Sequence, residues 1–324
     1  MRPTLSSLLE VKQLATHYIL PRSVVKAVDR IDFSLNEGET LALVGESGCG
    51  KSATAYSIMG LVSPPGRIVA GEILFQGTDL CTISPEELRQ LRGDRLAMIF
   101  QEPMTSLNPV LTTGFQIAEG LRLHRGLSAK EARGEAVRLL DQVGIPAPVE
   151  RYNAYPHQMS GGMKQRVMIA MALACRPRLL IADEPTTALD VTIQAQILEL
   201  IDQLKQQTGM SLLLITHDLG IVAERAHATA IMYAGRIVEQ GSTKEILTNP
   251  LHPYTRGLLA SLPQGGRPGE PLATIAGQVP SLSMELPGCG FCDRCPDPTG
   301  QCRVERPPVL EPTPGHRVSC WKCL

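Results

Sequence analysis

The stretch Gly45–Ser52, GESGCGKS, constrains the fold more than any other part of the chain. It matches, without a mismatch, the pattern of a glycine, any four residues, and then Gly-Lys-Ser or Gly-Lys-Thr. The apolar run Leu41–Val44 has strand length and precedes it, and Ala53–Met59 can continue as a helix. A glycine-rich turn between a strand and a helix offers backbone N–H groups and a positive helix end to phosphate. The sequence therefore predicts a phosphate-binding loop in an α/β fold.

The residue types of this loop predict separate roles. Gly48 and Gly50 let the backbone turn its N–H groups inward, Lys51 can reach the β- and γ-phosphates, and the Ser52 hydroxyl can hold Mg²⁺. Tyr18 falls at the end of a predicted strand, where its ring can stack on adenine, although a plain surface tyrosine fits the same pattern. The predicted ATP-binding set comprises Tyr18, Gly45, Ser47, Gly48, Cys49, Gly50, Lys51, Ser52 and Thr54.

Composition indicates a globular protein that does not bind nucleic acid. The chain has 324 residues, of which 43% are hydrophobic and 19% charged, and its net charge is -1. This length predicts one large or two modest domains, and this charge offers no electrostatic surface for nucleic acid. No apolar run approaches the about 18 residues that span a bilayer, and residues 1–13 lack a signal-peptide core. We therefore expect a cytoplasmic chain that reaches the membrane through partners.

Apolar periodicity predicts the main elements. Leu9–Tyr18 and Ala27–Leu35 alternate apolar and polar residues, which is typical of half-buried strands in an antiparallel sheet. From Glu102 to about Ala154 the pattern is helical, and Ala129–Val143 spaces its apolar residues at three and four. Three largely apolar runs, typical of parallel strands covered on both faces, are Leu96–Phe100, Leu179–Ala182 and Leu212–Thr216.

Two of these apolar strands end in residues that suit phosphate chemistry. Asp183 and Glu184 follow one strand, and His217 and Asp218 follow another. The carboxyl ends of parallel strands form the crevice where ligands of α/β folds bind. Asp183 is placed to organise Mg²⁺ and its waters, and Glu184 to polarise a water for attack on the γ-phosphate. Two solvated acids at a strand end are the simpler interpretation, which the phosphate loop in the same chain disfavours.

A second element of phosphate-binding type is Ser160–Arg166, SGGMKQR, at the start of an apolar-rich helix. It offers a hydroxyl, free N–H groups and a positive helix end. Because one nucleotide does not need both elements, we expect two chains to pair head to tail, each giving this element to the nucleotide of the other. An ordinary N-capped helix is the alternative. The residues expected to act on the partner's ATP are Ser160, Gly161, Gly162 and Gln165.

Five motifs resemble, in order, the Walker A, Q-loop, signature, Walker B with D-loop, and H-loop of ABC transporter ATPases: GESGCGKS, IFQEP, MSGGMKQR, LLIADEPTTALD and LLLITHD. The series covers roughly Leu9–Gly241. By this resemblance Gln101 contacts Mg²⁺ and the attacking water, Ala188-Leu189-Asp190 lies across the dimer interface, and His217 contacts the γ-phosphate. Tyr18 aligns with the family's adenine-stacking aromatic residue. The implied catalytic residues are Glu184, His217 and Gln101, and the implied Mg²⁺ ligands are Ser52, Gln101 and Asp183.

A narrower likeness comes from QEPMTSLNP (Gln101–Pro109), HPYTRGLL (His252–Leu259) and a cysteine-rich tail. These segments resemble the dipeptide, oligopeptide and nickel branch of binding-protein-dependent importers, and most of all its first ATPase subunit. The likeness implies a second, different ATPase chain, two membrane permeases, an extracytoplasmic substrate-binding protein, and a place on the cytoplasmic face of the inner membrane. Peptides are the expected cargo, and nickel or a metal–chelator complex is the alternative.

The tail holds six of the nine cysteines, and such clustering in a reducing compartment suggests a metal before a disulfide. Resemblance to the branch implies a [4Fe-4S] cluster on Cys289, Cys295, Cys302 and Cys320. Cys292 and Cys323 depart from that pattern, and Cys292 creates Cys-x2-Cys-x2-Cys, which also begins a ferredoxin-type run. Cys292 is therefore a further candidate ligand. Zinc on four thiolates and a site without metal are the alternatives.

The expected fold is an α/β P-loop NTPase of the ABC cassette type, with an antiparallel β subdomain and a helical subdomain at about residues 102–175. We expect the ATPase domain over residues 1–250 and a small cysteine-rich C-terminal domain over 251–324, with Pro263–Pro271 as a linker. A soluble ABC protein acting on DNA or ribosomes would carry coiled-coil insertions or a second cassette, and neither is visible. An iron–sulfur redox protein would not devote most of its chain to a cassette.

Overall fold

The computed structural model describes residues 7–102, 106–186, 190–262 and 274–323. They divide into two compact units. The first unit comprises residues 36–38 and 82–213, and the second comprises residues 7–35, 39–81 and 214 onward. The predicted linker Pro263–Pro271 and the motif residues Pro103, Ala188 and Leu189 lie outside the described residues.

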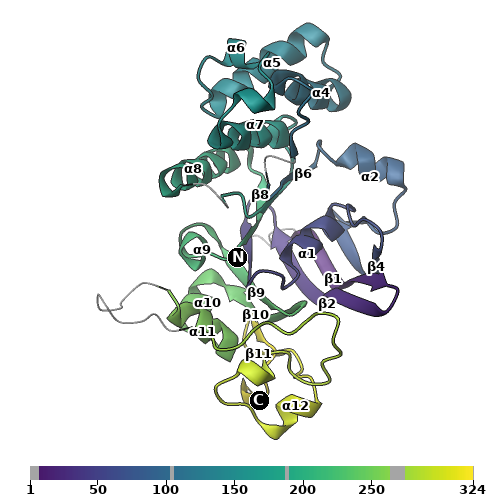
Figure 1. The fold of residues 1–324 in the computed structure, drawn as a ribbon, viewed down its shortest axis with the longest axis vertical. Coiled ribbons are helices and arrows are strands. Elements are labelled where there is room, and N and C mark those ends of the chain that lie inside the picture. Colours follow the sequence, from purple (N-terminus) through teal and green to yellow (C-terminus); the bar gives the residue numbers. More distant parts are fainter. Residues whose placement is uncertain (1–6, 103–105, 187–189, 263–273, 324) are drawn as a thin grey trace, which may run out of the picture. The chain divides into compact units, whose positions relative to one another are not determined.

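The first unit is built from helices and two paired strands. Its elements are α2 (Pro85–Leu91), β6 (Leu96–Ile99), α4 (Thr113–Arg125), α5 (Ala129–Gln142), α6 (Pro148–Arg151), η1 (Pro156–Gln158), α7 (Gly161–Leu173), β7 (Leu179–Asp183) and α8 (Val191–Thr208). Strands β6 and β7 are parallel, with Leu96 opposite Leu179 and Ile99 opposite Ala182. This pairing confirms the prediction of parallel apolar strands. Helices α4, α5 and α7 pack on one another (Figure 1).

Helix α5 shows why the helical prediction succeeded. Ser128 caps it: the Ser128 hydroxyl accepts a hydrogen bond from the Glu131 N–H, and the Glu131 carboxylate accepts one from the Ser128 N–H. Its buried residues, Ala132, Ala136, Leu139 and Leu140, follow the three-and-four spacing of the sequence. The helix predicted over Ala129–Val143 is therefore confirmed within one residue.

The second unit contains most of the strands. Its elements are β1 (Ser7–Leu20), β2 (Ser23–Asn36), β3 (Thr40–Val44), α1 (Lys51–Ile58), β4 (Gly66–Phe75), β5 (Thr78–Asp79), α9 (Leu219–Arg225), β9 (Ala228–Tyr233), β10 (Arg236–Ser242), α10 (Thr243–Thr248), α11 (Pro253–Ala260), η2 (Cys292–Arg294), α12 (Gly300–Val304), β11 (Leu310–Thr313), β12 (His316–Val318) and η3 (Trp321–Cys323). The division between the units falls inside β8 (Ser211–Thr216), after Leu213.

One sheet of the second unit has the strand order β2-β1-β4-β5. Strands β1 and β4 are antiparallel, with Leu9 opposite Phe75 and Tyr18 opposite Gly66. The strands predicted over Leu9–Tyr18 and Ala27–Leu35 lie within β1 and β2. The antiparallel sheet predicted from the alternation is thus confirmed, although burial in β1 does not strictly alternate, since the neighbours Leu8 and Leu9 are both buried.

In this unit the C-terminal segment extends the sheet that carries the strand before the phosphate loop. The strand order is β11-β12-β10-β9-β3. Strand β3 is parallel to β9, whereas β10 is antiparallel to both β9 and β12. Residues on both sides of the boundary predicted at residue 250 therefore belong to one sheet.

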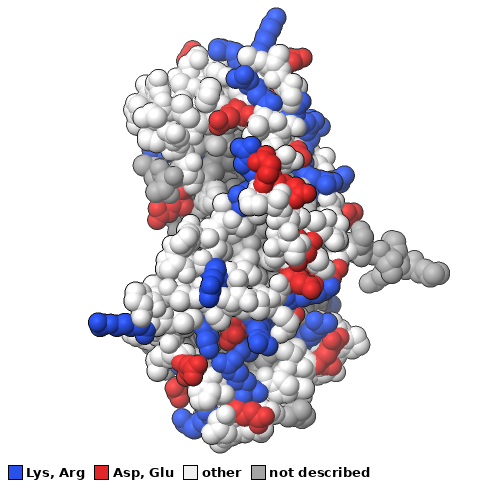
Figure 2. All heavy atoms as spheres, turned by 90° about the vertical axis from the view of Figure 1, so that its right-hand side faces the viewer, with Lys and Arg blue, Asp and Glu red and all other residues white. Residues whose placement is uncertain are grey.

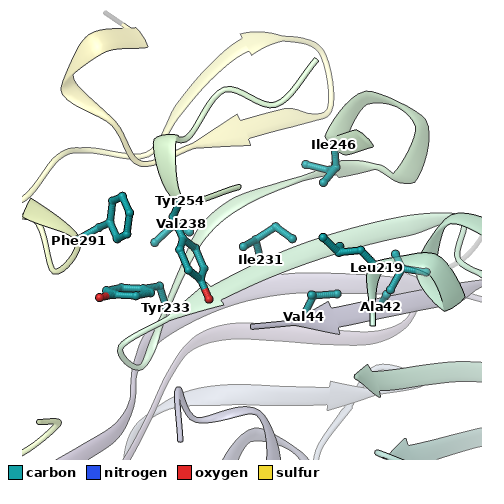
Figure 3. Packing of buried hydrophobic residues seen from close by; sticks show 10 residues of the cluster. Ala42, Val44, Leu219, Ile231, Tyr233, Val238, Ile246, Tyr254 and Phe291 are labelled. Atoms are coloured by element: carbon teal, nitrogen blue, oxygen red, sulfur yellow. The ribbon is translucent and has the colours of Figure 1, made fainter. Parts of the chain in front are cut away.

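Three aromatic rings join the C-terminal segment to this sheet. Tyr233 of β9, Tyr254 of α11 and Phe291 are each at most 2% exposed. The ring centroids are 4.6 Å apart for Tyr233 and Tyr254, and 5.3 Å apart from Phe291 to each tyrosine. Figure 3 shows the three rings grouped at one end of the buried cluster that also contains Val44 and Ile231. Close edge-to-face rings add to the stabilisation that burial alone provides.

The buried carboxylate of Glu239 in β10 also binds the C-terminal segment. Glu239 accepts hydrogen bonds from the Leu251 N–H at 2.7 Å and the His252 N–H at 2.9 Å, and it contacts His316 Nε2 at 2.8 Å. Burial of a carboxylate is costly unless hydrogen bonds compensate. These three contacts therefore fix the start of α11 and strand β12 against β10.

The surface mixes charges of both signs. On the face drawn in Figure 2, Lys and Arg side chains lie interspersed with Asp and Glu. Ion pairs in the second unit include Asp29 with Arg236 at 2.7 Å and with Arg306 at 3.3 Å. As for membranes, the described helices include none with the length and hydropathy needed to cross a bilayer.

Candidate functional site

The phosphate loop joins β3 to α1 in the second unit, and two of its glycines are needed for close packing. A Cβ at Gly50 would lie 2.1 Å from the Ala27 carbonyl oxygen, and Gly50 has φ 112°. A Cβ at Gly45 would lie 2.2 Å from the Met232 carbonyl oxygen. Gly48 has φ 78° but open space around it. The loop backbone therefore rests directly on the neighbouring backbone, which only glycine permits.

Lys51 is turned into its own loop. Its ammonium group donates to the Gly45 carbonyl at 2.7 Å and to the Glu46 carbonyl at 3.1 Å, and the side chain is buried. Ser47 and Gly48 are exposed, and Ser52 is half-buried. The lysine amine thus lies inside a loop whose central residues face solvent.

The two remaining predicted loop residues are buried. The Thr54 hydroxyl donates to the Gly50 carbonyl at 3.0 Å, within the first turn of α1. Cys49 is fully buried, and burial raises the pKa of its thiol, so the thiol is neutral at pH 7. These two buried side chains pack beneath the loop and support its conformation.

Tyr18 and His217 also belong to the second unit. The Tyr18 ring packs against Gly66 of β4, where a Cβ would approach a ring carbon at 2.7 Å. Tyr18 remains half-buried. His217 follows β8 with an exposed side chain. The next residue, Asp218, caps α9 by accepting hydrogen bonds from the N–H groups of Gly220 and Ile221, at 2.8 and 3.3 Å.

In the first unit, Gln101 and Glu184 meet because they follow neighbouring parallel strands. Gln101 Nε2 donates to Glu184 Oε2 at 3.3 Å. Asp183, the last residue of β7, is buried, and Glu184 has φ 45°. A left-handed conformation costs a residue with a side chain about 1 kcal/mol, and such strain concentrates at functional positions. The structure therefore brings two of the three predicted catalytic residues together.

The signature element opens α7 in the same unit. The Ser160 hydroxyl accepts a hydrogen bond from the Met163 N–H at 3.3 Å. Among the described residues, a Cβ at Gly161 would meet nothing within 4 Å, whereas one at Gly162 would lie 3.3 Å from Ile193 of α8. Gln165 is buried and donates to the Pro185 carbonyl at 2.6 Å, one residue after Glu184. The signature helix is thus tied to the segment that carries Glu184.

Asp190, the described residue of the predicted D-loop, starts α8. Its carboxylate accepts a hydrogen bond from the Ile193 N–H at 3.0 Å, which is an N-cap contact. The side chain is exposed.

Five of the six cysteines of the tail line one small pocket in the second unit. Its lining includes Cys289, Cys292, Cys295, Cys302 and Cys320, together with His252, Phe291 and Trp321. All of these cysteines are free thiols. The pocket thus unites the four predicted cluster ligands with the fifth candidate, Cys292.

The donor set of this pocket suits a thiolate-bound metal group, although the described residues include no set of three or more His, Cys, Asp or Glu arranged to hold a single metal ion. Burial raises the pKa of Cys289 to about 11, so its thiol is protonated at pH 7. A bound cation deprotonates coordinating thiols outright. Five sulfurs around one pocket fit an iron–sulfur cluster in donor chemistry.

Sequence reasoning missed Tyr254 and Arg294 as contacts of the phosphate loop. The Tyr254 hydroxyl accepts a hydrogen bond from the Glu46 N–H at 3.1 Å, and burial raises the pKa of this tyrosine. The Arg294 guanidinium contacts the Glu46 carboxylate at 2.9 Å. Both residues lie in segments that the sequence singled out, HPYTRGLL and the cysteine tail. Their spacing along the chain carries no signal of this contact.

These elements define a P-loop ATPase cassette, and comparison with known proteins gives its family. Residues 28–187 match the ABC transporter family, and residues 238–302 match the C-terminal region of oligopeptide/dipeptide transporters. The chain belongs to the ABC transporter ATP-binding proteins, within their dipeptide/oligopeptide branch, and is an ABC-type ATPase.

Individual relatives match over nearly the whole chain. The chain is 51% identical to the dipeptide transport ATP-binding protein DppD of Escherichia coli, over 97% of this chain and 96% of that protein. It is 50% identical to the oligopeptide transport ATP-binding protein AppD of Bacillus subtilis, over 98% and 97%. Among solved structures, the dimeric cassette MJ0796 in a post-hydrolysis state with ADP and Pi is similar, with a TM-score of 0.66 and 27% identity, over 72% of this chain and 98% of that one.

The packing of the phosphate loop predicts that alanine substitutions at two of its glycines lower the free energy of unfolding by different amounts. Gly50→Ala forces a methyl group against the Ala27 carbonyl and should lower the free energy of unfolding by at least about 3 kcal/mol. Gly48→Ala meets open space, so only the left-handed backbone is penalised, by about 1 kcal/mol. Urea unfolding of both variants measures the difference. Equal losses of stability would contradict this account of the loop.

Proposed function

We propose that this protein hydrolyses ATP to power the import of di- or oligopeptides through an inner-membrane ABC transporter. The observation that carries the proposal is the 51% identity to the dipeptide transport ATP-binding protein DppD over 97% of this chain. The match to the C-terminal region of oligopeptide/dipeptide transporters supports the same branch.

We propose that the phosphate loop binds ATP and that three side chains carry out the hydrolysis. Lys51 would contact the β- and γ-phosphates, and Glu184 would polarise the attacking water. Gln101 would orient that water, a role supported by its hydrogen bond to Glu184. His217 would contact the γ-phosphate, and its exposure after β8 leaves it accessible. Ser52, Gln101 and Asp183 would hold Mg²⁺, and Tyr18 would stack on adenine.

We further propose that two ATPase chains enclose the ATP, each giving its signature element to the nucleotide of the other. The opening of α7 supports this arrangement: Ser160 and Gly161 are exposed, and no atom of the described residues lies within 4 Å of a Cβ built at Gly161. A helix N-terminus with free N–H groups attracts phosphate. Asp190 would lie across the same dimer interface, and the similarity to a dimeric cassette agrees with pairing.

The partner chain would be a different ATPase, and the pair would act beneath two membrane permeases fed by an extracytoplasmic substrate-binding protein. This arrangement would place the protein on the cytoplasmic face of the inner membrane, as a peripheral subunit. The support is the branch to which the chain belongs.

We propose that the cysteine-lined pocket holds a [4Fe-4S] cluster on Cys289, Cys295, Cys302 and Cys320. A cluster would supply a covalent staple for a segment that has little core of its own. The chain's own contribution is to gather the thiols: the Cys289 N–H donates to the Cys302 carbonyl at 2.8 Å, which joins two ligand segments. Zinc is the alternative occupant, and Cys292 is an alternative ligand.

Transport in cells tests the function. Cells lacking this protein should recover uptake of a labelled dipeptide when they receive the wild type, but not when they receive Glu184→Gln. The variant should still bind ATP, while its hydrolysis falls at least about a hundredfold, because general-base catalysis contributes that much. Recovery of nickel uptake, free or chelated, without peptide uptake would overturn the proposed cargo. Unchanged hydrolysis by Glu184→Gln would refute the role of Glu184.

Metal analysis tests the pocket. Protein purified without oxygen should contain iron and acid-labile sulfide in equal amounts, about four of each per chain for a [4Fe-4S] cluster. Cys302→Ala should lose both, because it removes one proposed ligand, whereas Cys81→Ala should retain both, because Cys81 lies outside the pocket. Stoichiometric zinc without iron would overturn the cluster in favour of the alternative.

A further inference from the structure

Arg294 is a residue of the cysteine-rich segment whose guanidinium contacts the phosphate loop. Arg294 Nη1 donates to Glu46 Oε2 at 2.9 Å, and Nη2 donates to Glu46 Oε1 at 3.1 Å. The Arg294 side chain is 7% exposed and that of Glu46 is 28% exposed. Paired N–H donors on one carboxylate form the strongest and most directional type of ion pair. The two residues are 248 positions apart in the sequence.

The guanidinium has no freedom to reorient in this position. Besides the two bonds to Glu46, Nε donates to the Ala276 carbonyl at 2.9 Å, Nη1 to the Tyr233 hydroxyl at 3.2 Å, and Nη2 to the Ile275 carbonyl at 3.3 Å. An arginine has five N–H donors in a rigid planar fork. These contacts engage all five, so the position of the fork fixes the position of the Glu46 carboxylate.

Glu46 transmits this position to the rest of the loop. Its N–H donates to the Tyr254 hydroxyl at 3.1 Å. Its carbonyl accepts hydrogen bonds from Lys51 Nζ at 3.1 Å and from the Cys49 N–H at 3.3 Å. Glu46 therefore lies between the arginine of the C-terminal segment and the lysine of the phosphate loop.

Because Glu46 is negatively charged, Arg294 affects how well the loop can bind a nucleotide. A carboxylate in a loop that binds phosphate repels the ligand, and partial burial strengthens that repulsion because the surroundings are less polarisable than water. The adjacent guanidinium neutralises the carboxylate. Without it, the carboxylate would either remain unpaired beside the phosphates or turn toward solvent and disturb the carbonyl that holds Lys51.

We propose that Arg294 is a positioning residue for the phosphate loop: it fixes and neutralises Glu46, and through Glu46 it sets the affinity for the nucleotide phosphates. The proposal rests on the proposed function, in which this loop binds ATP. Because Arg294 ends the short helix η2 that starts at Cys292, a change in the backbone of the cysteine-rich segment displaces the guanidinium. The cysteine-rich segment is thus part of the nucleotide site and not an appendage to it.

The test is a double-mutant cycle on ATP affinity. The full chain is purified without oxygen as wild type, Arg294→Met, Glu46→Gln and the double variant, and the dissociation constant for ATP is measured at constant salt. Arg294→Met should weaken ATP binding about tenfold, since an unpaired, partly buried carboxylate costs at least one charge-assisted hydrogen bond. Adding Glu46→Gln should restore affinity at least about threefold, because it removes the charge left unpaired.

A matched control separates this effect from a general weakening of the segment. Arg303 also belongs to the cysteine-rich segment and pairs with Asp293 at 3.4 Å, but that pair is exposed. Arg303→Met should leave the ATP dissociation constant within about twofold of the wild type, as surface pairs contribute little. The metal content and unfolding midpoint of each variant are measured alongside, and the constants are compared between samples of equal metal content.

The kinetic readout distinguishes positioning from a structural role. In the assembled transporter, Arg294→Met should raise the KM for ATP about tenfold and leave kcat within about twofold, since the groups that act on the water are unchanged. If Arg294→Met does not fold, Arg294→Gln takes its place in the cycle, because its amide can still donate hydrogen bonds whereas the positive charge is lost.

The possible outcomes distinguish a failure of the proposed function from a failure of the proposed role of Arg294. Wild-type protein that does not bind ATP would sink the proposed function itself. Wild-type binding with unchanged affinity in Arg294→Met would overturn the role of Arg294 alone. Weakened binding that Glu46→Gln does not restore would likewise overturn it, because the loss would then not act through Glu46.

Discussion

In the second unit, a bidentate ion pair between Arg294 and Glu46 fixes the carboxylate of the phosphate loop. It joins the loop between β3 and α1 to the cysteine-rich segment, across 248 positions of sequence. The loop could not keep its shape through glycine alone, because Gly48 and Gly50 are the residues with the greatest backbone freedom. Its order comes from fixed neighbours: Lys51 bonded to two loop carbonyls, and Tyr254 bonded to the Glu46 N–H. A flexible sequence is thereby held in one conformation before any ligand binds, which favours affinity.

In the first unit, the residues proposed to hydrolyse ATP are also linked by direct hydrogen bonds. Glu184 follows β7 in a left-handed conformation and accepts a hydrogen bond from Gln101. Gln165 of the signature helix bonds to the Pro185 carbonyl, one residue further along. The helix that we expect to read the partner's nucleotide is therefore connected by one hydrogen bond to the segment that we expect to activate water.

The sequence predicted what local pattern encodes. Alternation identified β1 and β2, apolar spacing identified α5 within one residue, and glycine spacing identified the loop after β3. The contact of Arg294 with Glu46 could not be predicted, because no periodicity relates positions so far apart. Strands β11 and β12 were missed since runs of four and three residues are too short to show alternation. The crowding of cysteines in the tail was visible in the sequence and their ligand set was implied by resemblance, whereas the pocket that they share brings together residues as far apart as Cys289 and Cys320.

The central claim is that the phosphate loop and the cysteine-rich segment form one nucleotide-responsive structure. Amide hydrogen exchange measures it most directly, on the purified full-length Glu184→Gln variant with and without ATP and Mg²⁺. The account predicts that ATP slows exchange both in residues 45–52 and in residues 289–295, because Glu46 and Arg294 hold them together. Slower exchange in residues 45–52, with no change in residues 289–295, would contradict it.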